Sequence, residues 1–263
     1  MDLGLKGKVA LVAGASTGLG FATAMELAAE GASVAIVSRT EGGLRNAADK
    51  IASATGARVL PVPGDVTVDR DVDRMIDQTV SSFGRLDILV PNGGGPPAGF
   101  YNDFAPDDYR KAIDLTLVST VSMCLGAVPH MRKQKWGRIV AITSIAAKEP
   151  VQNLILSNTA RAGTLGFLKS LSQQVAQDGI TVNALCPGYH LTERLRSLAA
   201  LKAEKEGVAV DDVQRMMAAE VAMKRLGDPK EFAALAAFLC SERATYITGT
   251  VTQVDGGLYK GLF

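Results

Sequence analysis

The sequence predicts an α/β fold, in which one doubly wound domain is built on a seven-stranded parallel sheet flanked by helices. Short apolar runs alternate with longer amphipathic segments, which is the pattern of βαβ units around a parallel sheet. The runs are rich in Val, Ile and Leu rather than strictly alternating, as expected of strands that helices cover on both faces. A chain of 263 residues is long enough to bury the core of one large α/β domain.

The expected elements follow one another in this alternating order. The strands are expected at residues 8–14, 33–39, 58–66, 86–94, 137–144, 180–188 and 251–257. The helices are expected around residues 18–30, 44–54, 72–83, 107–131, 157–177 and 230–241. Residues 192–224 break the alternation, because they are polar and favour helix. Ligands bind at the carboxyl ends of the strands in doubly wound sheets, so we expect this insertion to be a helical lid within a single domain of residues 1–263.

Composition excludes several classes of partner. Lys and Arg number 28 against 27 Asp and Glu, so no basic excess points to nucleic acid or to an anionic membrane. The first apolar run is too short to span a membrane. The cysteines Cys124, Cys186 and Cys240 are far apart and odd in number, which argues against disulfides and fits a reducing cytoplasm. With two histidines in the chain, we expect no zinc site and no metal.

A glycine-rich loop, "AGASTGLG", lies between the first strand and the first helix. Gly14, Gly18 and Gly20 permit a tight turn and let backbone amides approach a pyrophosphate without an intervening Cβ. The helix that follows adds free N–H groups and the positive end of its dipole. The position between a strand and a helix makes this loop a predicted dinucleotide-binding site.

The spacing G-x-x-x-G-x-G resembles that of the short-chain dehydrogenase/reductase superfamily, and the likeness runs through essentially the whole chain. Further matches are the Asp-Val pair after the third strand, "PNGGG" at 91–95 and "PGYHLT" at 187–192. The resemblance is to the 3-oxoacyl-(acyl-carrier-protein) reductase-like branch, and it implies a Rossmann fold that binds a nicotinamide dinucleotide. The cofactor contacts that it implies are Gly14, Ser16, Thr17, Gly18, Leu19, Gly20, Asp65, Val66, Asn92, Gly93, Gly94, Pro187, Gly188 and Thr192.

The choice between the two nicotinamide cofactors is made at the end of the second strand. Enzymes that use NAD place an acidic residue there, which binds the ribose 2′-hydroxyl. This chain has Ser38 and Arg39 instead. Because a guanidinium can pair with a 2′-phosphate and stack on adenine, we expect NADP(H) rather than NAD(H).

The resemblance also implies a catalytic set of serine, tyrosine, lysine and asparagine, from which this chain departs. Ser144 stands at the serine position, but the tyrosine position is Ser157 and the lysine position is Arg161. Thr116 stands where the asparagine is expected. In the family the lysine lowers the tyrosine pKa from about 10 towards neutrality, and the tyrosine then protonates the carbonyl oxygen. Three of the four positions therefore differ from the family pattern.

The altered set still suits part of the reaction. Arg161 can hold a positive charge beside the nicotinamide ribose, but it cannot pass a proton at physiological pH. Ser144 and Ser157 can polarise a carbonyl by hydrogen bonding, although an aliphatic hydroxyl is a far weaker acid than a phenol. Tyr189 and His190 follow the sixth strand at the correct end of the sheet. We therefore expect Tyr189 or His190 to replace the missing phenol.

Several functions remain open from the sequence. The first is an NADP(H)-dependent oxidoreductase that reduces a ketone or 3-oxoacyl-type carbonyl, or oxidises the matching alcohol. The second is a catalytically impaired NADP(H)-binding module with a sensing or structural role. A halohydrin-dehalogenase-like function fits least, because those relatives keep the tyrosine and lose the glycine loop. A purely structural interpretation of residues 155–163 makes Ser157 or Asn158 a helix cap and leaves Arg161 solvated.

Two further expectations concern surfaces. The chain ends with apolar residues that are costly to leave in water, so we expect burial against a neighbouring subunit in a homotetramer or homodimer. These residues are Leu258, Tyr259, Leu262 and Phe263. We also expect an apolar wall for a small-molecule substrate from Pro96, Pro97, Phe100, Tyr101 and Phe104.

Overall fold

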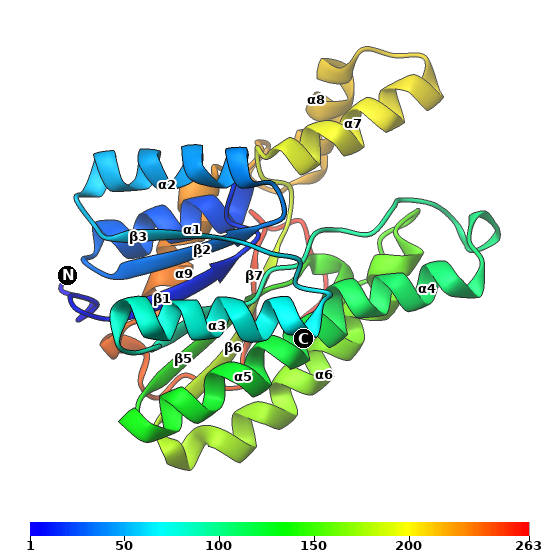
Figure 1. Cartoon of the computed structure of the whole chain (residues 1–263). Coiled ribbons are helices and arrows are strands. Elements are labelled where there is room, and N and C mark those ends of the chain that lie inside the picture. The colour runs from blue at the N-terminus through cyan, green and yellow to red at the C-terminus, as the bar shows by residue number, and fades with distance from the viewer. Residues whose placement is uncertain (263) are drawn as a thin grey trace.

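The computed structural model describes residues 1–262 and folds them around a parallel sheet (Figure 1). Within these residues the sheet has seven strands in the order β3-β2-β1-β4-β5-β6-β7, and every neighbouring pair is parallel. The order reverses between β1 and β4, which makes that pair the switch point of a doubly wound sheet. The predicted fold class is confirmed. The strands are β1 (Val9–Ala13), β2 (Ser33–Ser38), β3 (Val59–Pro63), β4 (Ile88–Val90), β5 (Gly137–Ile142), β6 (Ile180–Pro187) and β7 (Val251–Val254).

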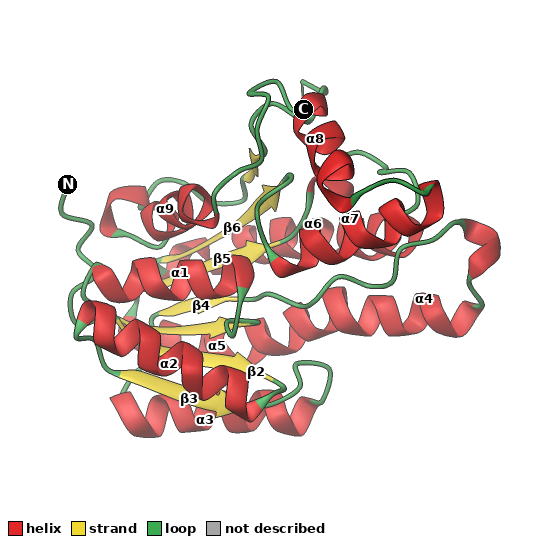
Figure 2. Ribbon diagram, turned by 90° about the horizontal axis from the view of Figure 1, so that it is seen from above, coloured by secondary structure: helices red, strands yellow, loops and turns green. Residues whose placement is uncertain are grey.

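Helices cover both faces of the sheet, as Figure 2 shows in the view from above. The helices on one face are α1 (Gly18–Ala29), α2 (Glu41–Thr55) and α9 (Pro229–Leu239). The helices on the other face are α3 (Asp69–Phe83), α5 (Ser119–Gln134) and α6 (Ile155–Val175).

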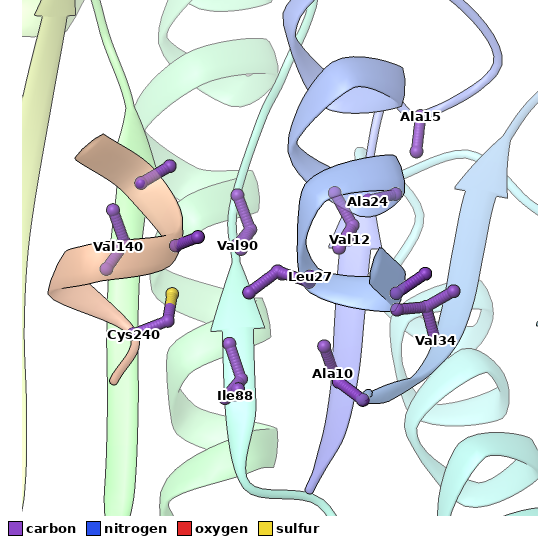
Figure 3. Close-up of a cluster of buried hydrophobic side chains, with 14 of the residues drawn as sticks. Ala10, Val12, Ala15, Ala24, Leu27, Val34, Ile88, Val90, Val140 and Cys240 are labelled. Carbon is purple, nitrogen blue, oxygen red and sulfur yellow. The ribbon is translucent and has the colours of Figure 1, made fainter. Parts of the chain in front are cut away.

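Strand β1 explains why the apolar runs do not alternate with polar residues. All five of its side chains are buried. Ala10 and Val12 point into the core under α1 and α9, where Figure 3 shows them beside Leu27, whereas Leu11 and Ala13 point into the core on the opposite face. Since successive strand side chains face opposite ways, a strand covered on both faces must be apolar throughout.

The helix expected around residues 107–131 is interrupted by a wider turn. It begins with α4 (Pro106–Ile113), passes through a π-helical turn at Asp114–Val118 and continues as α5. Pro106–Gln134 is long and apolar enough to cross a membrane. Core helices of soluble proteins share this length and composition, so these two properties do not identify a membrane span. Its α5 portion places Met123, Cys124 and Met131 in the core of the domain.

The insertion contains two helices, α7 (Glu193–Glu206) and α8 (Val210–Glu220), which form a helical hairpin. It stands on the side towards which the strand arrowheads point (Figure 2). The hairpin has a small apolar cluster of its own, and Tyr189 and Leu226 join this cluster to the body of the domain. The buried members of the cluster are Leu195, Ala199, Ala203, Val213 and Met217.

A buried carboxylate fixes the amino end of the central strand pair. Asp87, which is fully buried just before β4, accepts hydrogen bonds from the Val9 amide at 2.8 Å and from Arg85 Nε at 2.7 Å. A second Arg85 nitrogen lies 2.6 Å from the other carboxylate oxygen. One side chain therefore links the start of β1 to the approach to β4, the two strands that flank the switch point.

We predict that Asp87→Ala lowers the free energy of unfolding by about 1–3 kcal/mol, because it leaves the buried Val9 amide without its acceptor, whereas the Arg85 side chain is 41% exposed and stays hydrated. Urea denaturation monitored by circular dichroism measures the change. Asp107→Ala is the matched control, since it removes an exposed carboxylate from the pair with Arg110 and should cost at most about 1 kcal/mol. Equal losses in the two variants would contradict the structural role of Asp87.

Candidate active site

A cavity of about 330 Å³ opens at the carboxyl ends of the central strands. Its walls come from the loops after β1, β4, β5 and β6, from the start of α6, and from the first turn of α7. The cavity brings together these residues named from the sequence: Gly14, Thr17, Gly18, Leu19, Asn92, Gly93, Gly94, Ser144, Ser157, Arg161, Pro187, Gly188, Tyr189, His190 and Thr192.

The glycine loop is bare enough for a dinucleotide pyrophosphate. Gly14 has φ +59°, and a Cβ there would lie 2.6 Å from Asn92 Nδ2. A Cβ on Gly20 would lie 2.3 Å from the Gly14 carbonyl oxygen, so neither position tolerates a side chain. Thr17 precedes α1 without a side-chain cap, and the first turn holds no acidic residue. The positive end of α1 is therefore available to an anion, and the loop fits the predicted cofactor.

The residues predicted to bind adenosine lie at the end of β2 and just after β3, and they are not among the residues that line the cavity. Arg39 is exposed, and within residues 1–262 its side chain has no hydrogen bond or ion pair. The Ser38 hydroxyl donates to the Thr40 carbonyl at 3.4 Å. The Asp65 carboxylate accepts hydrogen bonds from the Thr67 amide and hydroxyl at 2.9 and 2.8 Å. A free guanidinium at the end of β2 is what recognition of a 2′-phosphate requires.

Ser144 and Ser157 both line the cavity but are held differently. Ser144 lies two residues after β5, where its Oγ accepts a hydrogen bond from the Ala146 amide at 3.1 Å and caps a short 3₁₀ turn. Ser157 lies in the first turn of α6 and is 6% exposed. Its hydroxyl does not cap the helix, and the Asn158 side chain bonds instead to both backbone groups of Val151. The structural interpretation in which Ser157 or Asn158 caps α6 is therefore wrong.

Arg161 is buried, which also contradicts the solvated interpretation. It is 8% exposed, and its two terminal nitrogens donate long hydrogen bonds to the Ile142 and Gly94 carbonyls, at 3.5 and 3.4 Å. Its Nε is buried without a partner. No carboxylate within residues 1–262 forms an ion pair with it. Burial lowers the pKa of this guanidinium to about 10, and repulsion from Arg194 acts in the same direction.

Tyr189 and His190 both reach the cavity from the loop after β6. The Tyr189 hydroxyl donates to the exposed carboxylate of Glu220 at 3.2 Å, and burial raises the pKa of this phenol to about 12. His190 is 4% exposed, and its ring meets Phe232 edge-on with centroids 5.7 Å apart. Burial lowers the pKa of His190, so its imidazole is neutral at pH 7.

Two expectations about the residues that line the cavity are wrong, and two further residues line it without having been expected to. Thr116 does not line it, because its hydroxyl bonds to the Ala112 carbonyl at 2.9 Å inside the helix. Arg194 and Glu193, in the first turn of α7, line it although the sequence analysis did not name them. Their position at the start of the predicted lid is the signal that should have drawn attention to them. The expected apolar wall at residues 96–104 is also absent from the cavity, whose apolar side comes instead from Ile145, Val151, Leu154, Leu195 and Leu198.

Thr192 also has a structural role at this end of the sheet. It precedes α7, and its hydroxyl accepts a hydrogen bond from the Leu195 amide at 3.2 Å. It therefore caps the first helix of the hairpin while lining the cavity that the hairpin borders.

Comparison with known proteins places this geometry in a family. Residues 14–259 match a family described as enoyl-(acyl carrier protein) reductase. The chain is 34% identical to the 3-oxoacyl-(acyl-carrier-protein) reductase FabG of Salmonella typhimurium, over 98% of this chain and 99% of that one. It is 33% identical to D-beta-hydroxybutyrate dehydrogenase of Cupriavidus necator, with 96% and 98% covered.

Solved structures agree with the sequence matches. The crystal structure of L-sorbose reductase from Gluconobacter frateurii, complexed with NADPH and L-sorbose, superposes with a TM-score of 0.95 at 36% identity and covers all of both chains. The glycine loop, the switch point and the serine at the end of β5 are thus found together in a chain that matches reductases and dehydrogenases along its length. The protein belongs to the short-chain dehydrogenase/reductase superfamily of oxidoreductases.

Proposed function

We propose that the protein is an NADP(H)-dependent reductase of a small ketone or 3-oxoacyl-type carbonyl, working reversibly on the matching alcohol. The observation that carries this proposal is the shared cavity, which joins the glycine loop to Ser144, Ser157 and Arg161. A protein that only senses a dinucleotide has no need of polar donors beyond the cofactor site. The NADPH bound to the sorbose reductase supports the same cofactor here.

The free guanidinium of Arg39 and the absence of an acidic residue at the end of β2 favour NADP(H) over NAD(H). The residues that would hold the cofactor are the glycine loop at the pyrophosphate, Arg39 at the 2′-phosphate, and Arg161 with Thr192 on the nicotinamide side. The bound cofactor supplies the hydride. Ser144 and Ser157 donate hydrogen bonds to the substrate carbonyl and polarise it.

We assign the proton to Tyr189 rather than to His190. A phenol with a pKa of about 12 stays protonated below that pH, and it still gives its proton to an alkoxide, which is a much stronger base. Glu220 is exposed and bonded to the phenol, so it offers a path by which solvent restores the proton. His190 is 4% exposed, its ring packs edge-on against Phe232 and its Nδ1 lies 3.4 Å from the Gly188 carbonyl, so its imidazole has no carboxylate hydrogen-bond partner within residues 1–262.

The remaining assignments concern the setting of the enzyme. The α7–α8 hairpin is a lid over the cavity, since its first turn supplies cavity-lining residues. The protein is cytoplasmic, a location that its three free cysteines favour. It is a homotetramer or homodimer, because the edge strand β7 is only half-buried and Leu262 is 92% exposed. Phe263, which was expected to join that interface, lies outside the described residues.

The function is tested by calorimetry with NADPH and NADH, followed by absorbance at the nicotinamide band with ketones, quinones and 3-oxoacyl thioesters. Tight binding of NADPH and its oxidation by a carbonyl compound are the expected results. Tight binding without oxidation across the panel would instead support the cofactor-binding module.

We predict that Arg39→Ala weakens NADPH binding by about 10- to 100-fold, because it removes charge-assisted hydrogen bonds to the 2′-phosphate. NADH binding should change little. Calorimetry with both cofactors measures the two effects, and Arg45→Ala, which removes another exposed arginine on α2, is the control. A similar loss of affinity for NADH would show that Arg39 does not recognise the 2′-phosphate.

We predict that Tyr189→Phe lowers kcat at least about 100-fold, as expected when a general acid is removed, while leaving the Kd for NADPH unchanged. His190→Gln should lower kcat far less. Steady-state kinetics between pH 6 and 9 measure both variants, with melting temperatures as a check on folding. Full activity in Tyr189→Phe, or a larger loss in His190→Gln, would overturn the assignment of the proton.

A further inference from the structure

We propose that the carbonyl substrate carries a carboxylate, and that Arg194 of the lid binds it together with Arg161. The natural substrate is then a short oxo acid rather than a neutral ketone or a thioester. This inference rests on the proposed function, because it names the substrate class of the same cavity.

Two guanidiniums converge on one loop from opposite elements. Arg161 on α6 donates to the Gly94 carbonyl at 3.4 Å, and Arg194 on α7 donates to the Pro96 carbonyl at 2.7 Å. A Cβ on Gly95, between these two acceptors, would lie 2.9 Å from a terminal nitrogen of Arg194. Both arginines line the cavity, and the positive charge of Arg194 acts with burial to lower the pKa of Arg161.

The cavity holds little negative charge to balance them. Among its lining residues, Glu193 carries the only carboxylate, and that residue is exposed in the first turn of α7. Tyr189 and His190 are neutral at pH 7. Within residues 1–262 neither Arg161 nor Arg194 forms an ion pair with a carboxylate. Arg194 is exposed, whereas Arg161 is 8% exposed, and a buried cation without a partner is costly, so a ligand that carries an anion would complete the arrangement at Arg161.

The donors left over point to the same ligand. The Nε of Arg161 is buried and without a partner, and its other two hydrogen bonds are long. The five N–H groups of a guanidinium allow Arg161 to serve the ribose on one edge and a carboxylate on another. Arg194 lies in the first turn of the 14-residue helix α7, where the helix dipole also favours an anion.

The size of the cavity limits how many carbon atoms the oxo acid can have. About 330 Å³ is at the small end of the range for ligand sites, and the nicotinamide must share that space. The apolar side, which includes Val151, Leu154 and Leu198, suits a few carbon atoms rather than a long acyl chain or a sugar. We therefore assign a 2-oxo or 3-oxo acid of a few carbons.

The experiment compares each acid with its own methyl ester, using 2-oxobutanoate and 3-oxobutanoate with NADPH. The pairs present the same ketone and differ in charge. In the wild-type protein we expect the preferred acid to have a kcat/KM at least about tenfold above that of its ester. Arg194→Gln should raise the KM for the acid by about 10- to 100-fold, with the kinetics of the ester within threefold of the wild-type values.

Two further variants control for charge and for folding. Arg196→Gln removes an exposed arginine two residues along α7 that does not line the cavity, so it should leave both substrates unaffected. Arg194→Lys keeps the charge and should retain part of the preference for the acid. Melting temperatures within about 3 °C of the wild type, a shift that corresponds to less than about 1 kcal/mol, exclude loss of the lid fold.

A second measurement is independent of turnover. Malonate, which has carboxylates but no ketone, should bind to the NADP⁺-loaded protein in calorimetry, and Arg194→Gln should weaken that binding at least about tenfold. Equal kcat/KM for acid and ester, or malonate binding that is absent or unchanged by Arg194→Gln, would overturn the anion site and leave the reductase standing. Arg194-dependent malonate binding without reduction of any pair would support the anion site and refute the proposed reductase.

Discussion

The charge of Arg161 is the constraint around which the site is arranged. A guanidinium that is 8% exposed, with one buried nitrogen unbonded and without an ion pair in residues 1–262, is costly to keep in a folded protein. The fold meets part of that cost with carbonyl oxygens from the ends of β5 and the β4 loop. We propose that a bound ligand meets the rest. Binding of a ligand next to Arg161 should therefore raise the stability of the folded protein more than binding next to a surface arginine would.

In the proposed mechanism, this constraint accounts for a redistribution of the family's proton relay. A tyrosine–lysine pair combines proton donation and positive charge in two residues one helical turn apart. Here Arg161 retains the charge but cannot donate a proton, and Ser157 retains a hydrogen-bond donor but is too weak an acid. We propose that proton donation comes instead from the loop after β6, where Tyr189 has an exposed carboxylate beside it. The change thus separates polarisation, charge and proton supply among three elements.

Much of this arrangement could be predicted from the sequence because it depends on local patterns. The strands are buried on both faces, so their apolar runs reveal them, and the glycine spacing marks the loop before α1. The burial of Arg161 could not be predicted, because a helical position gives no sign of which carbonyls will face it. Thr116 was placed correctly in its helix, but its side chain turns back to the Ala112 carbonyl. Arg194 was missed because its role depends on how the lid folds over a loop almost a hundred residues earlier in the chain.

In the proposed function, this altered set of side chains still supports hydride transfer from NADPH to a carbonyl carbon. This transfer is tested most directly by a single turnover with NADPH deuterated at the nicotinamide C4, in which the product is analysed by mass spectrometry. We expect one of the two C4-deuterated forms to give an alcohol one mass unit heavier, with the label on the former carbonyl carbon. Recovery of intact labelled NADPH from a saturated complex with the oxo acids and ketones would contradict it.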